Sequence, residues 1–370
     1  MIGYKSYNAR QKQFTFIFAF LILRKDRSFV IQQRQKAVLL VNVGTPDGPD
    51  TRSVRRYLSQ FLNDRRIMDI PWLFRKILVN LFIVPFRAPQ SARLYARLWT
   101  AKGSPLLVHT KQFASALQNT LSNDYHVFTA MRYGNPSLRK TLREIQNRDF
   151  DEIIVFPLFP QYASSTVGTI LDFIMKEVKR WPVIPELRFI HQFYDHPGFL
   201  RAFSEKISAY HPEKYDHIIF SYHGLPLSHI NKIHPEIAAV SCTCEKTMPS
   251  HGKHCYKATC YETSRLLAQK LQLKEGQFTT AFQSRFSKNW LQPFTDEVLI
   301  QLARKGVKKV LVAVPSFVAD CLESVVEIGW ENRQLFLREG GRDLTLVESI
   351  NDDEQWVNTA AEIIHSAGSF

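Results

Sequence analysis

Short apolar runs that stop at glycine, proline or small polar residues recur along the chain from residue 36 onward. The run 37–43 ends at a Gly-Thr-Pro turn, and the run 218–220 ends at a polar cluster closed by Gly224. Runs of this length, rich in β-branched residues and bounded by turn residues, are typical of buried parallel strands. The segments 52–62 and 137–147, which follow such runs, are expected to be helices.

The order of these patterns repeats in the second half of the chain. The segment 181–185 contains two prolines and is interpreted as a linker, because the residue before a proline is disfavoured in helix. After it, 217–226 echoes 37–46, and 310–317 echoes 153–159. Strands that alternate with helices predict an α/β fold with parallel sheets, here two similar lobes with a cleft between their strand ends. The echo is faint, and two unrelated α/β units would also account for it.

Residues 1–35 contain one apolar run, 14–23, with basic residues on both sides. A run of this length is too short to span a bilayer, which takes about 20 residues. The charged sequence 24–27 follows where a signal peptide would have a small-residue cleavage site. We therefore expect 1–35 to be an N-terminal extension, interfacial or poorly ordered, that carries no chemistry.

His223 follows the predicted strand at 218–220, within the sequence Ser-Tyr-His-Gly-Leu-Pro. Open α/β sheets bind their ligands at the carboxyl ends of the strands, so this histidine is expected at the rim of a binding cleft. Imidazole titrates near neutral pH and binds transition metals. A packed, hydrogen-bonded histidine is the alternative that position alone leaves open.

Charge and composition narrow the class of partner. Apolar content of 45% and charged content of 22% are ordinary for a globular protein. The formal net charge of +14 favours an anionic partner, such as a nucleic acid, an anionic membrane surface or an acidic small molecule. The chain has no long basic run and no zinc-finger or RNA-recognition signature, so no nucleic-acid partner is expected.

The segment 81–89 interleaves apolar residues with Arg87 and is followed by Arg93, Arg97 and Trp99. Apolar surface mixed with arginine predicts either a lip that holds an amphipathic anion or a surface that touches a membrane. An ordinary packed helix with a solvated face fits the pattern equally well.

Four of the five cysteines lie close together in sequence: Cys242, Cys244, Cys255 and Cys260. This clustering is unlike the disulfide framework of a small secreted domain and favours a reducing compartment. Four thiolates in one loop suit a [2Fe–2S] cluster or a structural zinc ion, with His251 or His254 able to replace one thiolate at zinc. A reduced loop without metal is the third interpretation, but we expect such a loop to lack anything that holds it in place.

Six motifs, in order along the chain, resemble those of the ferrochelatases, the enzymes that insert ferrous iron into a porphyrin. They are Leu-Val-Asn-Val-Gly-Thr-Pro at 40–46, Met-Arg-Tyr at 131–133, Phe-Pro-Gln-Tyr at 159–162, Ser-Tyr-His-Gly-Leu-Pro at 221–226, Phe-Gln-Ser-Arg at 282–285 and Phe-Val-Ala-Asp-Cys-Leu-Glu at 317–323. Any one of them is a weak signal, whereas all of them in the family order are specific.

The resemblance implies one chain of two Rossmann-like lobes, each a parallel sheet flanked by helices, with a porphyrin held in the cleft between them. The first lobe would span 36–183 and be joined by a C-terminal helix at 352–368. The second lobe would span 184–351 and contain the cysteine-rich insertion 227–261. The implied activity is insertion of Fe²⁺ into protoporphyrin IX to form haem, with release of two protons. The chain has no Walker A pattern, which agrees with a lyase that uses no nucleotide.

The resemblance also implies catalytic roles. His223 and Glu323 match the family's metal-site histidine and glutamate and are expected to act as base and metal ligands. Glu323, Glu327 and Glu331 are spaced to line one helix face, where like charges cost about 0.2–0.5 kcal/mol per pair. A solvated face is the ordinary explanation of that spacing, but the resemblance favours a row of carboxylates that passes metal or protons.

Further matched positions are expected near the macrocycle, where aromatic rings would stack on it and polar groups would reach its propionates. These expected substrate-binding residues are Arg87, Arg132, Tyr133, Phe159, Tyr162, Ser284, Trp290 and Phe317. Cys321 stands where many animal members of the family have histidine, a departure from the pattern.

Some ferrochelatases carry a [2Fe–2S] cluster, so the resemblance favours iron–sulfur over zinc at the four clustered cysteines. The expected partners are a porphyrin and ferrous iron, and the expected location is the cytoplasm, with peripheral contact at the inner face of the membrane. Two alternatives stay open. One is a chelatase for another tetrapyrrole, such as coproporphyrin III or a sirohydrochlorin that takes cobalt, and the other is a non-catalytic two-lobed haem-binding protein.

Overall fold

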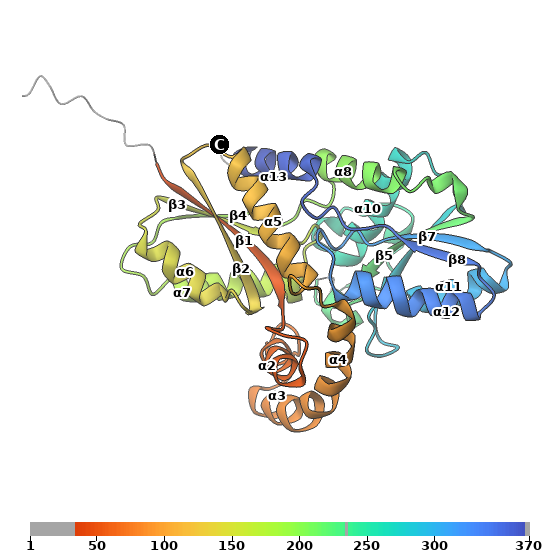
Figure 1. The fold of residues 1–370 in the computed structure, drawn as a ribbon, viewed down its shortest axis with the longest axis horizontal. Helices are drawn as coiled ribbons and strands as arrows, with labels where there is room; N and C mark the ends of the chain where they lie inside the picture. Colours follow the sequence, from red (N-terminus) through yellow and green to blue (C-terminus); the bar gives the residue numbers. More distant parts are fainter. Residues whose placement is uncertain (1–33, 234–235, 367–370) are drawn as a thin grey trace, which may run out of the picture. The chain divides into compact units, whose positions relative to one another are not determined.

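The computed structural model describes residues 34–233 and 236–366, and within them two four-stranded sheets form the framework (Figure 1). The first sheet has the strand order β2-β1-β3-β4 and the second the order β6-β5-β7-β8, with all neighbouring strands parallel. The strands are β1 (Lys36–Thr45), β2 (Tyr125–Gly134), β3 (Glu152–Pro157), β4 (Glu186–Phe189), β5 (His217–His223), β6 (Phe278–Gln283), β7 (Lys309–Ala313) and β8 (Asp343–Leu346).

The two sheets follow one plan. In each, the first strand along the chain lies inside the sheet, the second lies at the edge beside it, and the third and fourth follow on the other side. Leu39 and Leu40 of β1, which point to opposite faces, are both fully buried, as are Ile219 and Phe220 of β5. Burial on both faces explains the continuous apolar runs of these strands. The predicted α/β fold with two parallel sheets is confirmed.

Helices cover the faces of the sheets and extend from their ends. They are α2 (Thr51–Leu62), α3 (Trp72–Ile77), α4 (Val84–Leu98), α5 (Pro105–Thr120), α6 (Leu138–Asn147), α7 (Thr169–Val178), α8 (Pro197–Ser208), α9 (Leu227–Asn231), α10 (Tyr256–Lys270), α11 (Thr295–Arg304), α12 (Arg333–Arg338) and α13 (Glu354–Ser366). Short 3₁₀ turns are η3 (Pro212–Lys214), η4 (Thr243–Glu245) and η5 (Gly252–His254). Three segments are π-helical: η1 (Leu78–Ile83), η2 (Ser164–Gly168) and η6 (Leu322–Asn332). Such segments are rare and occur often at functional sites.

The segment 181–185, predicted to link the lobes, lies within the first sheet's connections. It joins α7 to β4, and β4 pairs with β3 through Leu187 and Ile153. The first sheet therefore extends beyond the boundary expected between residues 183 and 184. Prolines before a short edge strand stop a helix as well as they mark a linker, so this pattern does not distinguish the two.

The C-terminal helix α13 packs against α5 and α8, as Figure 1 shows. Its Trp356 is fully buried and stacks on Phe113 of α5, with ring centroids 5.5 Å apart. The same indole stacks on Phe193, at 5.3 Å. The apolar cluster that contains Trp356 continues to Phe220 of β5, so the two sheets share one core.

The segment 72–98, which comprises α3, η1 and α4, lies below the carboxyl end of β1 in Figure 1, and we call it the lip. Many of its large apolar side chains are exposed, namely Trp72, Leu73, Phe74, Ile77, Leu78, Leu81, Phe82 and Phe86. Phe86 has 71% of its surface exposed and Phe74 69%. The lip is therefore not an ordinary packed helix with a solvated polar face, since exposed apolar patches of this kind mark contact surfaces.

The apolar run at 14–23 lies outside the described residues, together with the rest of 1–33. Within residues 34–233 and 236–366, no helix combines the length and the apolar character that crossing a membrane requires.

Candidate active site

A cavity of about 540 Å³ lies where strands of both sheets end beside the lip, and we call it the cleft. Its walls include His223 at the end of β5, Phe159 and Phe317 in the loops after β3 and β7, and Arg87 of the lip. Ligands of open parallel sheets bind at this edge, where strands of different sequence position converge.

His223 is the last residue of β5 and is half-buried. Its Nδ1 lies 2.7 Å from the carbonyl oxygen of Gly224, and its backbone N–H donates to Ser316 Oγ at 3.3 Å. A carbonyl oxygen only accepts, so this hydrogen bond assigns the proton to Nδ1 and leaves the lone pair on Nε2. The imidazole packs near the rings of Trp290 and Phe317, each with a centroid separation of 6.4 Å. The side chain is thus oriented as a neutral base or metal ligand.

Glu323, Glu327 and Glu331 all line the cleft from η6. The sequence predicts one face of an α-helix, but the segment is π-helical, with i→i+5 hydrogen bonds. The three carboxylates nevertheless reach one cavity. They run from half-buried Glu323 and Glu327 to exposed Glu331, so the row connects the interior of the cleft with solvent.

Glu327 is held by Ser284, in the loop after β6. The Ser284 backbone N–H donates to Glu327 Oε1 at 2.6 Å, and the Ser284 hydroxyl donates to Oε2. Burial raises the pKa of Glu327 to about 7, against the lowering effect of the Ser284 hydroxyl and with a further raise from the charge of Glu323. This carboxyl can therefore exchange a proton near neutral pH. Ser284, expected to contact the porphyrin, lines the cleft but directs both donors to Glu327.

Ser284 itself adopts a φ of 62°, in the left-handed region that residues with a side chain rarely occupy. Its neighbour in the preceding strand, Gln283, pairs with His223 across β5 and β6. Gln283 Nε2 also donates to the carbonyl oxygen of Glu323, at 3.0 Å. The end of β6 therefore ties the histidine strand to the carboxylate row.

The aromatic and basic positions expected around the cleft are found there in part. Phe159, Trp290, Phe317 and Arg87 line the cleft. The guanidinium carbon of Arg87 lies 4.6 Å from the ring centre of Phe286, an exposed side chain of the second sheet's loops. This cation–π contact positions a positive charge at the rim.

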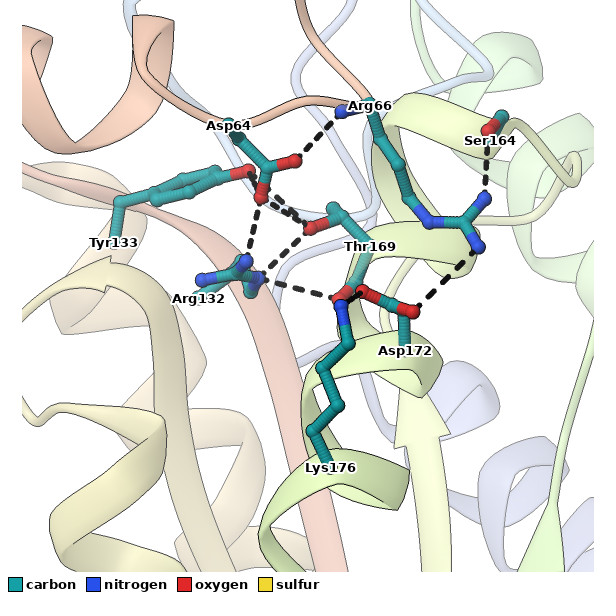
Figure 2. Close-up of polar contacts among 8 residues, drawn as sticks. All are labelled: Asp64, Arg66, Arg132, Tyr133, Ser164, Thr169, Asp172 and Lys176. Carbon is teal, nitrogen blue, oxygen red and sulfur yellow. Dashed lines mark hydrogen bonds and ion pairs between the residues drawn. The ribbon is translucent and has the colours of Figure 1, made fainter. Parts of the chain in front are cut away.

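Arg132, Tyr133 and Tyr162, also expected near the macrocycle, line a different cavity of about 940 Å³, which we call the polar cavity. Figure 2 shows Arg132 between Asp64 and Thr169. Its Nη2 donates to Asp64 Oδ2 at 2.5 Å and its Nε to Thr169 Oγ1 at 2.9 Å. The Tyr133 hydroxyl donates to the same Asp64 oxygen, at 2.9 Å. Arg132 and Tyr133 are thus fixed by partners that are distant in sequence, which no local motif reveals.

Buried tyrosines in the cleft wall, among them Tyr57 and Tyr95, were missed by the sequence analysis. Tyr57 of α2 and Tyr95 of α4 both line the cleft, with ring centroids 6.3 Å apart in an edge-to-face arrangement. Burial raises the pKa of both hydroxyls well above the ordinary range, and the charge of Glu323 acts in the same direction. Burial and the charge of Glu323 also raise the pKa of the Cys321 thiol. Because the tyrosines lie at inward positions of helices, the sequence does not distinguish them from core aromatics.

The four clustered cysteines are free and buried. Cys242 Sγ lies 3.5 Å from His251 Nε2. Burial raises the pKa of Cys260, and the charges of Cys255 and Cys244 raise it further. Burial raises the pKa of Cys244 to about 12. In the part of the chain that the structure describes, no three His, Cys, Asp or Glu side chains converge into a metal-binding group. Four thiols are a suitable donor set for four-thiolate ligation, but their sulfur atoms do not surround one point in this structure.

The cysteine loop is held in place by two basic side chains of α10. Lys257 Nζ donates to Ala239 O at 3.0 Å and to Glu245 Oε1 at 2.7 Å, and Arg265 Nη1 donates to Cys244 O at 2.9 Å. The expectation that the loop without metal would lack anything to hold it is therefore wrong, because these hydrogen bonds hold the backbone.

The fold and the cleft define a class of protein: two parallel α/β sheets that share a ligand cleft furnished with a histidine, a row of carboxylates and aromatic walls. The ferrochelatase family model matches residues 35–367. The chain belongs to the ferrochelatase family.

Relatives of similar length share its sequence. The ferrochelatase of Legionella pneumophila (strain Lens) is 40% identical over 335 residues, which cover 90% of this chain and 99% of that protein. The ferrochelatase of Coxiella burnetii (strain Dugway) is 40% identical over 351 residues, which cover 92% of this chain and 96% of that protein.

Among solved structures, SirB from Bacillus subtilis with Fe³⁺ aligns with a TM-score of 0.52 over 90% of this chain and 96% of that chain. The sequences are 10% identical. A similarity of this kind shows a shared chelatase fold and nothing about the substrate.

Proposed function

We propose that this protein inserts Fe²⁺ into protoporphyrin IX to form haem, with release of two protons and without a nucleotide. The observation that carries the proposal is that His223 and Glu323 line one cleft, the first from the end of β5 and the second from the start of η6. An imidazole with its lone pair on Nε2 accepts a proton or ligates ferrous iron, and a carboxylate adds a hard oxygen donor.

The two protons leave the pyrrole nitrogens as the metal enters, so a base must stand on one face of the macrocycle. His223 Nε2 takes the first proton, because its Nδ1 is occupied by the carbonyl oxygen of Gly224. Glu327, with its pKa of about 7, is suited to pass protons onward, and exposed Glu331 completes the row to solvent. Glu323, Glu327 and Glu331 thus form the path for protons, or for the metal in the opposite direction.

The porphyrin would be held by the aromatic and basic side chains of the cleft. Phe159, Trp290 and Phe317 offer flat apolar faces for the macrocycle, and Arg87 offers a charge for a propionate. Arg132, Tyr133 and Tyr162, which the sequence suggested as direct contacts, would act through the polar cavity instead. The apolar lip favours the greasier protoporphyrin IX over coproporphyrin III, which has four carboxylates.

The test is an anaerobic assay of the purified chain with Fe²⁺ and each of protoporphyrin IX and coproporphyrin III, followed by the absorbance of the metalloporphyrin. Faster turnover of protoporphyrin IX supports the proposal, and preference for coproporphyrin III would contradict the substrate assignment. The same assay with sirohydrochlorin and Co²⁺ tests the alternative that the protein is a chelatase for another tetrapyrrole. Tight haem binding without turnover would indicate a binding protein.

Variants of the carboxylate row test the mechanism within the same assay. Glu323→Gln keeps the shape of the side chain and removes its charge, so we expect a loss of metallation of about 10²–10⁴ in rate, comparable to the loss expected for His223→Ala. Glu327→Gln should do less harm, and Glu331→Gln the least, since it is exposed. Equal rates for all three would contradict a directional row.

We further infer that the protein works in the cytoplasm against the inner face of a membrane, which the lip touches. The support is the exposed apolar surface of the lip, which includes Trp72, Phe74 and Phe86, in a chain of formal net charge +14. Such a surface binds anionic lipid through apolar insertion and electrostatic attraction. Sedimentation with anionic vesicles tests this, and a Trp72→Ser/Phe74→Ser/Phe86→Ser variant should stay in the supernatant.

We also propose that Cys242, Cys244, Cys255 and Cys260 hold a [2Fe–2S] cluster, with zinc as the rival. The support is the donor set, four buried thiols in one short segment whose charges act on one another. When bound, the cluster would cross-link the loop and supply a one-electron redox centre. Because hydrogen bonds from Lys257 and Arg265 hold the loop already, metal loss should leave the loop folded.

The cluster proposal predicts a reddish protein after anaerobic purification, with two irons and two sulfides per chain, as a [2Fe–2S] centre requires. Replacement of any one of the four cysteines by serine should remove the colour. Cys321→Ser, which changes the cysteine outside the loop, is the matched control and should keep it. Colourless protein with stoichiometric zinc would show that the four cysteines bind zinc. Protein that holds neither metal after reconstitution would contradict both the cluster and the zinc hypothesis.

A further inference from the structure

The polar cavity carries more positive charge than its own carboxylates can neutralise. It is lined by seven arginine and lysine side chains and by three aspartates, and one of the cations, Arg139, pairs with Glu177 outside the lining at 2.9 Å. It is about 940 Å³ in volume, large enough for a small organic ligand. Apart from Arg132, these cations have no role in the metallation proposed for the cleft, so the cavity requires its own account.

The first group of charges centres on Asp172, at the start of α7. Lys176 Nζ donates to Asp172 Oδ2 at 2.6 Å, and Arg66 Nη2 lies 3.9 Å from the other carboxylate oxygen. Arg66 also donates to Ser164 Oγ at 2.9 Å. Figure 2 shows the single carboxylate between the two cations. One positive charge of this group is therefore left unneutralised within it.

A second group of lining charges surrounds Asp69. Lys232, next to α9, is hydrogen-bonded to the Asp69 carboxylate. This hydrogen bond lowers the pKa of Asp69, and the charge of Arg65 acts in the same direction. Again one carboxylate serves two cations. Lys76 of the lip adds another exposed positive charge to the lining.

Asp64, the third aspartate of the lining, differs from Asp172 and Asp69 because its own partners neutralise it. Its carboxylate accepts from Arg132 and from the hydroxyls of Tyr133 and Thr169. Burial alone would raise the pKa of Asp64, but the hydrogen bonds from Thr169 and from the Arg66 backbone N–H, with the charge of Arg132, lower it. The ionised Asp64 and Arg132 satisfy each other. The excess charge therefore belongs to the outer groups, around Asp172 and Asp69.

We propose that the polar cavity is a second ligand site, which takes a small anion with two or more carboxylate or phosphate groups. Two groups, each built on its own carboxylate and each with one unneutralised cation, match a ligand with at least two anionic groups better than a monoanion. Arginine and lysine on different elements supply both bidentate and point-charge contacts. The proposal is independent of the metallation reaction proposed for the cleft.

The site adjoins the cleft without belonging to it. His229 of α9 lines both cavities, whereas His223, Glu323 and Arg87 line the cleft and Arg66, Lys176 and Lys232 line the polar cavity. A ligand in the polar cavity would therefore sit beside the porphyrin without touching the metal-site residues. This separation allows binding to be measured with no porphyrin and no iron present.

The test is calorimetric titration of the full chain with citrate, pyrophosphate and inorganic phosphate at low ionic strength. Citrate or pyrophosphate should bind more tightly than inorganic phosphate, because each can engage both charge groups. Preference for citrate assigns the site to carboxylates, and preference for pyrophosphate assigns it to phosphates. Equal binding of inorganic phosphate, or no binding of any of the three, would overturn the proposal.

Two variants of opposite sign then locate the site. Lys176→Gln removes one charge-assisted contact and should weaken the better anion about tenfold. Asp172→Asn removes the competing carboxylate, so it frees both Lys176 and Arg66 and should strengthen binding severalfold. Changes of the same sign in both variants would overturn the proposal, because they would report altered structure and not altered charge.

Matched controls separate this site from general basicity. Lys206→Gln removes a lysine that is paired with Asp353 at 3.3 Å and does not line the polar cavity, and Arg87→Gln removes a cation of the cleft. Both should leave the anion affinity unchanged. Loss of binding in Arg87→Gln would place the anion in the cleft, and loss in Lys206→Gln would show nonspecific attraction to net charge, and either result overturns the assignment.

Discussion

The cleft and the polar cavity lie side by side, and each contains a buried carboxylate, yet the two carboxylates differ in charge state. Glu327 in the cleft has its pKa raised to about 7, chiefly by burial, and it faces Glu323 and Glu331. Asp64 in the polar cavity has its pKa lowered, because the hydrogen bonds around it and the charge of Arg132 outweigh its burial. Burial acts in the same direction on both groups, so the partners decide the outcome.

This contrast distinguishes a site that can transfer protons from a site whose charges have a structural role. A carboxyl with a pKa near neutral can exchange protons, whereas one held ionised by arginine acts as a structural anion. Two histidines of the cleft wall also differ, since His223 lines the cleft and not the polar cavity, whereas His229 lines both cavities. His223 keeps its lone pair on Nε2, through the hydrogen bond to Gly224, whereas His229 is a lining residue whose pKa is lowered by burial and by Lys232.

We expect the largest effect on activity when His223 and His229 are replaced by alanine, one at a time. His223→Ala should lower kcat for Fe²⁺ insertion by about 10²–10⁴ and leave porphyrin affinity largely intact, because a general base is lost. His229→Ala is the matched control and should stay close to wild type. Anaerobic turnover and porphyrin fluorescence quenching measure the two quantities. Wild-type kcat in His223→Ala would show that the assignment of the base is wrong.

The second prediction concerns Asp64. Asp64→Asn should lower the free energy of unfolding by about 3 kcal/mol at pH 7, because it leaves the partly buried Arg132 without its counter-ion. The folded-state pKa of Asp64 is lowered, so its stabilising contribution is present above the unfolded pKa of about 4 and is lost as the pH falls through the folded value.

Urea unfolding of wild type and Asp64→Asn from pH 7 down to pH 3.5 measures this difference. The gap between the two proteins should narrow at the acid end of the series. A gap that stays constant over the whole range would mean that the ionised carboxylate is not the stabilising form.

The third prediction has the opposite sign. Glu327→Gln should raise the free energy of unfolding at pH 8 by up to about 3 kcal/mol, because the folded protein then no longer holds an ionised carboxylate whose pKa is raised to about 7. Between the unfolded pKa near 4 and the folded value, the folded wild type binds the extra proton, so the advantage of the variant declines as the pH falls and disappears at the lower end.

The same urea experiment, run from pH 8 to pH 4.5, tests this third expectation. Ser284→Ala offers a comparison, since it removes the hydroxyl that stabilises the carboxylate and should lower stability most at high pH. A destabilised Glu327→Gln at pH 8 would contradict the raised pKa.

The smallest effect concerns the rim of the cleft. Arg87→Gln should weaken porphyrin binding by about two- to fivefold at low salt, since a rim charge is screened and partly exposed. The difference in porphyrin affinity between Arg87→Gln and wild type should decrease as ionic strength rises, because salt screens the attraction between Arg87 and the porphyrin in wild type. Fluorescence titration at several salt concentrations measures it. If the porphyrin affinity of wild type does not change with salt concentration, the basic charge does not serve porphyrin binding. Contact with the membrane would then be its role.

Much of the framework was predictable because its signals are local. The apolar runs at 37–43 and 218–220 became β1 and β5, and the polar stop after the second run delivered His223 to the cleft rim. The linker at 181–185 was misjudged, because proline restricts the backbone in the same way before an edge strand as between lobes.

The sequence by itself determined the two parallel sheets, the position of His223 at a strand end and the family to which the chain belongs, because periodicity, turn residues and ordered motifs are properties of short segments. Tertiary structure alone decided that Arg132 and Tyr133 bind Asp64 and not the cleft, that η6 is π-helical, and that Glu327 has a pKa near 7. These outcomes depend on partners such as Thr169 and Ser284, which lie 105 and 43 residues away along the chain from Asp64 and Glu327. Burial and hydrogen bonding act through space, and no local pattern encodes which distant group will arrive.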